Sequence, residues 1–377
     1  RVRPGEQETV TMALKLKSDK VLFLAAFLLV CVSVVMVYVA SSAHAAEQYQ
    51  NAEYYLWKQL SVAIVGLFAL WVLMHMDYRN YRQPVVIWTA LVGITVLLVA
   101  VLFSREVGGA RRWLWLSGIG VQPSEFAKLV VILFSAAILE RRMNRINDIG
   151  YALAPIAIVL AIVSILILLE PDLGTAVSII AIVGVMTFTA GLSFRYLLGG
   201  GFVILPLFVA VVAYSPERWA RWMTFMHPWE DPLNDGWQVA QSLIAVGTGG
   251  IWGVGRGAGV QQLGFLPEPH TDFIYAVIAE ETGLIGATAV LLCFCVVAWR
   301  GARIALRAPD RFGAFIAIGL TTMLTLQAFM NISVVLSLLP TTGIPLPFVS
   351  SGGSSLLCSL VGMGVLLNVS QHASAEG

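Results

Sequence analysis

Two stretches of this chain carry polar side chains whose types and spacing suit chemistry. In the first, REVGGARRWLWLSGIGVQPSEFAKL (105–129), Arg111 and Arg112 lie beside Trp113 and Trp115. Arginine binds phosphate through two parallel N–H donors, so this basic and aromatic patch is a candidate anion site. The alternative is a membrane-interface anchor, because Trp and Arg also favour the headgroup layer.

The second stretch, FLPEPHTDFIYAVIAEETGLIG (265–286), holds five ionisable residues within fourteen positions: Glu268, His270, Asp272, Glu280 and Glu281. Asp272 lies where a loop becomes an apolar helix, and an ordinary helix cap is one explanation for it. A cap does not explain the two glutamates, which fall about 80° and 180° from Asp272 around the helix. At least one of them is therefore expected to brace a neighbouring helix, with Lys128 as a candidate partner.

Glu125 and Lys128 lie three positions apart inside an apolar run. This spacing places them on one helix face, where we expect them to turn inward and pair. Charges inside a membrane are functional candidates, and the alternative is a structural pair that fixes helix packing.

The segment LLEPDLGTA (168–176) is predicted to be a tight turn between two helices. Pro171 ends the first helix, and Asp172 can cap the next through its unpaired backbone donors. Alternatively, Glu170 and Asp172 together could help to hold a cation.

The ninth apolar run and the segment after it combine polar side chains with irregular backbone. Gln327 and Asn331, four apart, predict hydrogen bonds to another helix. The prolines of LLPTTGIPLPFVSSGGSSLL (338–357) forbid a regular helix, and such backbone needs protein or a wet cavity around it. Ser354 and Ser355 could bind a phosphate or simply allow close helix packing.

The longest loop, 215–271, contains two further patterns. Arg218 and Arg221 alternate with aromatic residues in a way that suits a short helix on a membrane surface. The segment GTGGIWGVGRGAG (247–259) lacks the context of a nucleotide-binding loop. It is expected to be a mobile loop that could cover a substrate.

Composition defines the elements that must position these residues. The chain is 58% hydrophobic and 12% charged, whereas soluble domains are roughly a quarter charged. An apolar run of about 20 residues crosses a bilayer. The sequence predicts an all-α polytopic membrane protein whose domain, 21–370, has ten transmembrane helices at about 21–43, 58–76, 84–103, 124–140, 150–169, 172–191, 195–214, 272–299, 312–337 and 353–370.

The positions of Lys and Arg predict the orientation, because cytoplasmic loops are enriched in them. Fifteen of the 23 basic residues fall on alternate loops. Segments 1–20 and 371–377 are then cytoplasmic, without a cleavable signal peptide, and loop 215–271, between the seventh and eighth helices, is extracytoplasmic. The remaining loop arginines lie on the outer side and need another reason: Arg105, Arg111, Arg112, Arg218, Arg221 and Arg256.

These motifs resemble the SEDS family of FtsW, RodA and SpoVE. The matching segments span nearly all ten helices in the family's order: GARRW, QPSEFAKL, EPDLGT, HPWEDP, FLPEPHTDFIYAVIAEE and LPTTGIPLPFVSSGGSSLL. HPWEDP and QSLIAVGTGGIWGVG are more similar to the FtsW/SpoVE branch than to RodA.

The resemblance implies a peptidoglycan glycosyltransferase that polymerises lipid II outside the cytoplasmic membrane. It implies a class B penicillin-binding transpeptidase and other divisome proteins as partners, membrane lipid around the chain and no nucleic acid. It places the catalytic residue at Asp272, as general base for the attacking sugar hydroxyl. The substrate-binding candidates are Arg112, Glu125, Lys128, Asp172, Arg218, Arg221, Glu268, His270, Ser354 and Ser355.

A divalent cation, Mg²⁺ or Mn²⁺, is expected to help to stabilise the departing pyrophosphate, with its ligands left open. A lipid II flippase and a non-catalytic scaffold for a cell-wall synthase are the alternative functions. The in-span charges cluster toward the outer half of the membrane, which favours the enzyme. Division, sporulation and elongation roles, the oligomeric state and the partner interface stay open.

Overall fold

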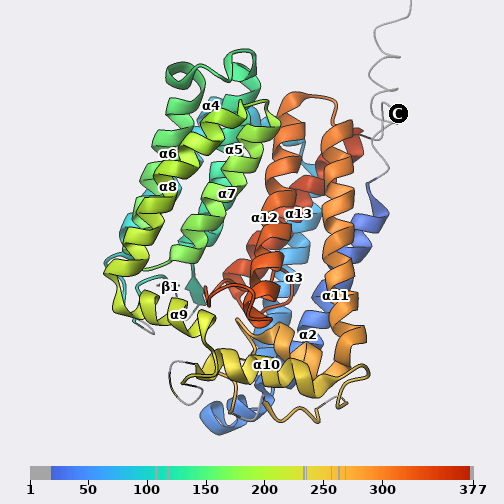
Figure 1. Ribbon diagram of the computed structural model, residues 1–377. Coiled ribbons are helices and arrows are strands. Elements are labelled where there is room, and N and C mark those ends of the chain that lie inside the picture. Colours follow the sequence, from blue (N-terminus) through green and yellow to red (C-terminus); the bar gives the residue numbers. More distant parts are fainter. Residues whose placement is uncertain are drawn as a thin grey trace, which may run out of the picture.

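The computed structural model describes residues 18–106, 109–116, 119–231, 234, 236–255, 257–261, 264–267 and 269–373. Two residues considered from the sequence, Arg256 and Glu268, lie outside this described part, as do most of segment 1–20 and the last four residues of the C-terminal tail. Figure 1 shows a bundle of long helices with a layer of shorter elements at one end.

Helices occupy all ten expected apolar runs. They are α2 (Lys20–Tyr49), α3 (Tyr54–His75), α4 (Pro84–Val101), α5 (Pro123–Arg142), α6 (Ala154–Leu169), α7 (Leu173–Thr189), α8 (Phe194–Tyr214), α11 (Ile274–Arg307), α12 (Arg311–Val335) and α13 (Gly353–Ala373). In the described part of the chain, eight segments are long and apolar enough to span a membrane. Helix α7 is shorter, and α5 carries several charges, so the count of ten spans stays a prediction.

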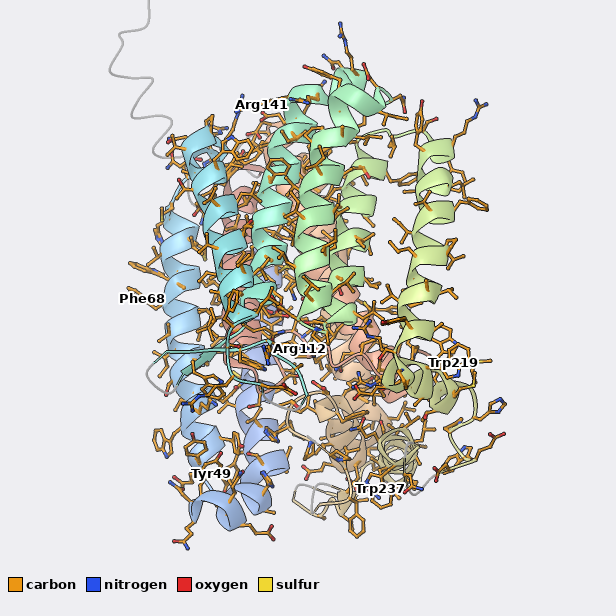
Figure 2. The ribbon with its side chains drawn as sticks, turned by 90° about the vertical axis from the view of Figure 1, so that its left-hand side faces the viewer. Tyr49, Phe68, Arg112, Arg141, Trp219 and Trp237 are labelled. Carbon is orange, nitrogen blue, oxygen red and sulfur yellow. The ribbon has the colours of Figure 1, made fainter. Side chains whose placement is uncertain are left out.

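The bundle has two halves, one built from α4 to α8 and the other from α2, α3, α11, α12 and α13 (Figure 1). Helix α12 joins them, because it packs against α11 on one side and against α5 and α7 on the other. Helix α8 is peripheral, with Val212 as its buried residue, and it stands apart from its neighbours in Figure 2.

Shorter elements complete the structure at the two ends of the bundle. At one end lie η1 (Tyr78–Arg82), η2 (Met143–Arg145) and η3 (Ile149–Leu153), beside Arg141. At the other end lie the hairpin of β1 (Leu114–Leu116) and β2 (Ile119–Val121), α9 (Pro216–Met226) and α10 (Trp237–Gly249). The helix expected around Arg218 is therefore present as α9.

Helix α11 is broken near its start, at Gly283, whose φ of 66° and ψ of −165° are not helical. Its 34 residues would run for roughly 50 Å, far more than the ~30 Å hydrocarbon core of a bilayer. The break separates the first turns, which carry Glu280 and Glu281, from the long apolar remainder. The glutamates thus belong to a separate short segment rather than to the middle of a span.

A glycine-rich segment (249–255 and 257–261) fills this break. The carbonyls of Glu280 and Glu281 accept hydrogen bonds from Val254 N (3.0 Å) and Gly255 N (3.2 Å), and Leu284 N donates to Gly250 O (2.9 Å). The two glutamate side chains, both 2% exposed, accept from the amides of the same segment: Gly257, Val260 and Gln261. The expectation of a mobile loop is therefore wrong, because the backbone of α11 holds this segment down.

The suggested bond between Lys128 and one of these glutamates is also wrong. Lys128 Nζ contacts Glu125 Oε1 at 2.7 Å, inside the bundle. The hydrogen-bond donors to these carboxylates are instead backbone N–H groups of the glycine-rich segment. The linear sequence does not reveal this pairing.

The contact between the glycine-rich segment and α11 leaves no room for a methyl group at Gly249. A Cβ there would lie 1.9 Å from the backbone oxygen of Ala279. We expect Gly249→Ala to lower the Tm of the purified protein by several degrees, because backbone atoms of α11 cannot move aside cheaply. Thermal unfolding in detergent measures this.

Gly247→Ala, two positions away in the same helix, is the matched control. A Cβ at Gly247 meets nothing within 4 Å, and alanine favours a helix over glycine by about 1 kcal/mol. Its Tm should equal or exceed that of the wild type. Equal melting of the two variants would contradict the close packing.

Candidate active site

Arg112 is fixed at the mouth of the bundle by backbone carbonyls. It lies just before the β1–β2 hairpin, and its Nε donates to the carbonyl of Glu170 at 3.2 Å. A second nitrogen donates to the carbonyl of Pro171. Both carbonyls belong to the turn between α6 and α7, so this turn sets the direction of the guanidinium.

Asp272 lies in the turn that leads into α11 and is half-buried. The helix-cap alternative is wrong, because α11 begins at Ile274 and its N-cap residue is Phe273, without a side-chain cap. Asn331 Nδ2 donates to the carbonyls of Asp272 and Ile344, each at 2.8 Å. Asn331, one of the two residues of the polar stripe predicted on α12, therefore holds the backbone of Asp272 and Ile344 rather than another helix.

Asp272 and Arg112 line the same cavity, of about 210 Å³, which we call the central cavity. Gly343 separates them without filling the space: its φ is +68°, and a Cβ there would lie 3.6 Å from Asp272 Oδ2 and 3.9 Å from an Arg112 nitrogen. A carboxylate and a guanidinium thus face one small space, and the positive φ at position 343 favours glycine there.

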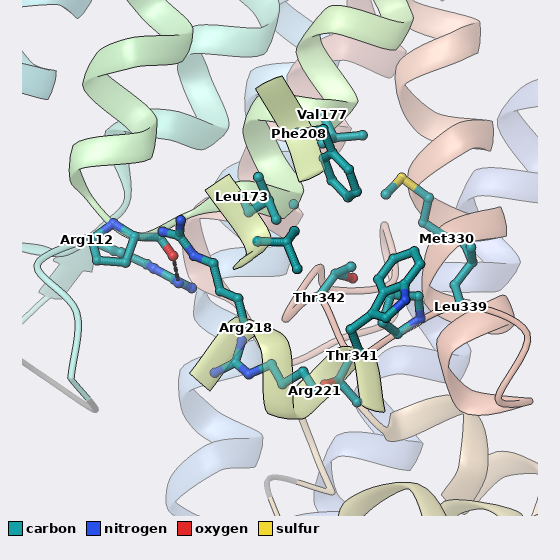
Figure 3. A pocket seen from close by; sticks show the side chains of 15 residues that line it. Arg112, Leu173, Val177, Phe208, Arg218, Arg221, Met330, Leu339, Thr341 and Thr342 are labelled. Carbon is teal, nitrogen blue, oxygen red and sulfur yellow. Dashed lines mark hydrogen bonds between the residues drawn. The ribbon is translucent and has the colours of Figure 1, made fainter. Parts of the chain in front are cut away.

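A second cavity, of about 240 Å³, adjoins the central one and is called here the arginine cavity. Arg112, Arg218 and Arg221 line it together with apolar residues of α7, α8 and α12, among them Val177, Phe208 and Met330 (Figure 3). Arg218 and Arg221 come from α9, one helical turn apart. The cavity therefore offers positive charge beside an apolar wall.

Other predicted site residues are engaged within the protein. Glu125 and Lys128 form the expected ion pair, with side chains 2% and 0% exposed. Asp172 caps α7 as expected, accepting from Thr175 N at 3.1 Å and from the Thr175 hydroxyl at 2.8 Å. Neither the pair nor Asp172 lines the cavities described above.

Three further candidates surround the site without lining these cavities. The buried ring of His270 packs against Tyr55 at 4.6 Å. The Ser354 hydroxyl accepts from Gln122 N at 2.9 Å, just before α5 begins, and Ser355 is buried nearby in α13. This bond ties the start of α13 to the residue before α5, and Glu268 lies outside the described residues.

Comparison with known proteins follows from this architecture. Residues 19–375 match the family model described as Cell cycle protein, which covers FtsW, RodA and SpoVE. A probable peptidoglycan glycosyltransferase FtsW of Geobacter metallireducens is 42% identical over 355 residues, covering 93% of this chain and 94% of that protein. Stage V sporulation protein E of Bacillus subtilis is 40% identical over 364 residues, covering 95% and 98%. The chain belongs to the FtsW/RodA/SpoVE family.

Solved structures agree with this assignment. A chain from a structure described as "Structural coordination of polymerization and crosslinking by a peptidoglycan synthase complex" superimposes with a TM-score of 0.78 and 30% identity, covering 95% of this chain and 99% of that one. Rod shape determining protein RodA of Thermus thermophilus gives 0.69 and 28%, covering 94% and 97%. The helical fold of this FtsW/RodA/SpoVE protein is thus a known membrane-protein architecture.

Sequence reasoning missed several residues of the site in this family member. Asn331 was seen only as a helix-packing residue, and Thr342 and Gly343 were not singled out. Their signal was the proline-rich segment after α12, whose irregular backbone required a cavity or polar partners. Which of its residues meet Asp272 depends on how α11 and α12 pack.

Glu170 was noted beside Asp172, but its environment is visible only in the structure. Its side chain is 0% exposed, and neither carboxyl oxygen has a hydrogen-bond partner. It lies in the turn between α6 and α7, outside the membrane-spanning helices. Burial raises the pKa of Glu170 to about 8, with Asp172 adding to the rise and Arg112 opposing it.

This pKa predicts a pH-dependent stability. The ordinary pKa of glutamate is about 4.3, so between that value and pH 8 the unfolded chain has lost the proton that the folded chain keeps. Stability therefore falls as the pH rises through this window and levels off above it. Glu170→Gln keeps the shape of the neutral acid without titrating, so its Tm should exceed that of the wild type at pH 8 and match it near pH 4.5.

The measurement is Tm against pH for both proteins in detergent. Glu230→Gln is the control, because the Glu230 side chain is 77% exposed, and its curve should run parallel to that of the wild type. A Glu170→Gln curve that also runs parallel would show that the buried carboxyl is ionised in the fold.

Proposed function

We propose that this protein is a peptidoglycan glycosyltransferase that polymerises lipid II into glycan strands. The observation that carries the proposal is the central cavity, where Asp272 and Arg112 face each other across Gly343. Membership of a family whose relatives are named peptidoglycan glycosyltransferase FtsW supports it.

The reaction joins a hydroxyl of one lipid-linked sugar to the anomeric carbon of another. The new carbon–oxygen bond forms as the bond from that carbon to the lipid pyrophosphate breaks. Asp272 takes the hydroxyl proton as general base. Arg112, Arg218 and Arg221 stabilise the negative charge that builds on the departing pyrophosphate, because their charges are held in place before the reaction begins.

The arginine cavity also suits the lipid part of the substrate. Its wall includes Phe208 and Val212 of α8, a helix whose remaining surface is largely exposed. An apolar chain attached to the pyrophosphate can therefore pass from the arginines along α8 into the surrounding membrane. Phosphate binding and chain binding meet in one cavity, as a lipid pyrophosphate requires.

A divalent cation, Mg²⁺ or Mn²⁺, is proposed as the cofactor. No cluster of three His, Cys, Asp or Glu ligands occurs among the residues that the structure describes. Magnesium, however, is commonly held by one or two carboxylates together with substrate phosphates. Asn331 Oδ1 and Thr342 Oγ1 are buried without hydrogen-bond partners in residues that line the central cavity, so with Asp272 they fit such a shared ion.

When bound, this cation would neutralise part of the pyrophosphate charge. The protein's own residues would set its place: Asn331 is fixed by its two backbone bonds, and Thr342 adjoins Gly343.

The proposed orientation puts the site on the outer face of the cytoplasmic membrane. The arginine-rich loops around Arg141 lie at the end of the bundle opposite Arg112 (Figure 2), and such loops favour the cytoplasm. Both termini would then be cytoplasmic. Lipid II reaches the enzyme from the outer leaflet in this arrangement.

A class B penicillin-binding transpeptidase is the proposed partner, with other divisome proteins, in cell division. The structural neighbour described as a peptidoglycan synthase complex that coordinates polymerization and crosslinking supports this association. Crosslinking of the new strand needs such a second activity beside the polymerase.

Asp272→Asn tests the base directly. It should lower the rate of glycan polymerisation by about 10²- to 10⁴-fold, because the amide cannot accept the proton. The assay follows labelled lipid II converted to polymer by the purified complex with its transpeptidase. Asp148→Asn, in the loop at the opposite end of the bundle, is the control and should polymerise normally.

Full activity of Asp272→Asn would remove this residue from the mechanism. No polymer from the wild type, together with movement of lipid II between the leaflets of a liposome, would favour a flippase instead. No polymer and no movement, with recruitment of the transpeptidase intact, would favour a scaffold.

Chelation with EDTA should abolish polymerisation, and added Mg²⁺ or Mn²⁺ should restore it. Thr342→Val removes the unpartnered hydroxyl, so the cation concentration for half-maximal rate should rise several-fold. Thr248→Val, at an exposed position of α10 that lines none of the described cavities, is the control. An unchanged cation requirement in Thr342→Val would exclude this hydroxyl as a ligand.

A further inference from the structure

A third cavity, of about 400 Å³, lies between α9 and α10 and is called here the outer cavity. It shares Arg221, Gln238, Pro267 and Thr341 with the central cavity. Arg221 and Thr341 line all three cavities, so they mark the junction of the site. The mechanism proposed above uses the central and arginine cavities and leaves the outer one without a role.

The lining of the outer cavity differs in chemistry from that of the arginine cavity. Glu217 accepts hydrogen bonds, Thr224 and Gln238 both donate and accept, and Trp237 adds an aromatic surface. The arginine cavity has three arginines beside an apolar wall. The outer cavity has one arginine, opposed by the carboxylate of Glu217, and few aliphatic side chains.

These groups discriminate between the parts of a lipid-linked sugar. A pyrophosphate would meet the Glu217 carboxylate, and an apolar chain would leave the amide and hydroxyl groups without partners. A neutral ring with many hydroxyl and amide groups can satisfy donors and acceptors of both kinds. Its C–H bonds can also lie against the electron-rich face of the Trp237 indole.

We infer that the outer cavity is a saccharide subsite, which holds a sugar unit of the glycan adjacent to the one that reacts. This inference rests on the proposed function, because it needs the reacting sugar in the central cavity. With the leaving pyrophosphate in the arginine cavity, the glycan would continue past Arg221 and Thr341 toward α9 and α10. The volume lies within the range of about 300–1,000 Å³ that is usual for small-molecule sites.

Helices α9 and α10 supply most of the side chains that line the proposed saccharide subsite. Helix α9 has no buried residue, yet it supplies Glu217, Arg221 and Thr224 to this cavity from one face. Helix α10 is anchored from below, since Ser242 donates to the carbonyl of Val335 on α12 at 2.8 Å. Gln238, one turn earlier, is thus held at a defined place between the central and outer cavities.

The test uses a soluble N-acetylglucosamine tetrasaccharide, which has neither lipid nor phosphate. Its binding to the detergent-purified protein is measured by saturation-transfer NMR and calorimetry at millimolar concentrations. Gln238→Ala should weaken binding by about tenfold, the equivalent of ~1.4 kcal/mol. The reason is that it removes the hydrogen bonds of the side-chain amide between the central and outer cavities. Gln238 is exposed, so the variant should fold.

Two control variants make the result specific. Thr248→Ala changes an exposed residue of α10 away from the cavity and should bind as the wild type does. Arg218→Ala changes the arginine cavity alone and should also leave tetrasaccharide binding unchanged. In polymerisation, Gln238→Ala should raise KM for lipid II more than it lowers kcat.

The inference is overturned if the wild type does not bind the tetrasaccharide, or if Gln238→Ala binds it as tightly as Thr248→Ala does. Loss of binding in Arg218→Ala would overturn it too, by placing the sugar in the arginine cavity. Asp272→Asn should still bind the tetrasaccharide while polymerising lipid II far more slowly than the wild type. Gln238-dependent binding in a wild type that makes no polymer would refute the proposed polymerase and leave the saccharide site standing.

Discussion

Asn331 donates both hydrogens of its side-chain amide to backbone carbonyls, one of Asp272 and one of Ile344. This pair of bonds joins two of the segments that line the central cavity, the turn before α11 and the loop after α12. Irregular backbone deep in an apolar protein must find partners for its polar groups. The site depends on this constraint, because these bonds, together with the bond from Ser351 N to the carbonyl of His270 (2.8 Å), hold the two segments against each other.

The same requirement explains most of the other polar residues in the bundle. Ser350 donates to the carbonyl of Thr271 at 2.6 Å, Ser354 accepts from Gln122 N, and Arg112 binds the carbonyls of the α6–α7 turn. Each bond fixes backbone that lies just before or just after a helix. Few charges are then left for chemistry, and those that line the central and arginine cavities are Asp272, Arg112 and the two arginines of α9.

The three connected cavities divide the proposed substrate by its chemistry. Arginines beside apolar α8 suit a lipid pyrophosphate, the carboxylate of Asp272 lies in the middle, and polar side chains with an indole lie beyond. Because Arg221 and Thr341 border all three cavities, a group bound in one cavity contacts residues that also line the next. Glu170 is buried beside Arg112, and its pKa is raised to about 8. At neutral pH it is therefore mostly protonated and adds no full negative charge beside that arginine.

The sequence by itself determined the helical membrane class, the places of the helices, the Glu125–Lys128 pair and the Asp172 cap, because these depend on apolar runs and on spacings within one helix. It also pointed to Asp272 and Arg112 through the family motifs. Only the tertiary structure decided what lies between them: Gly343, the bonds of Asn331, and the glycine-rich segment that takes up Glu280 and Glu281. These contacts join residues tens to hundreds of positions apart, and no local periodicity records which chain segments will meet.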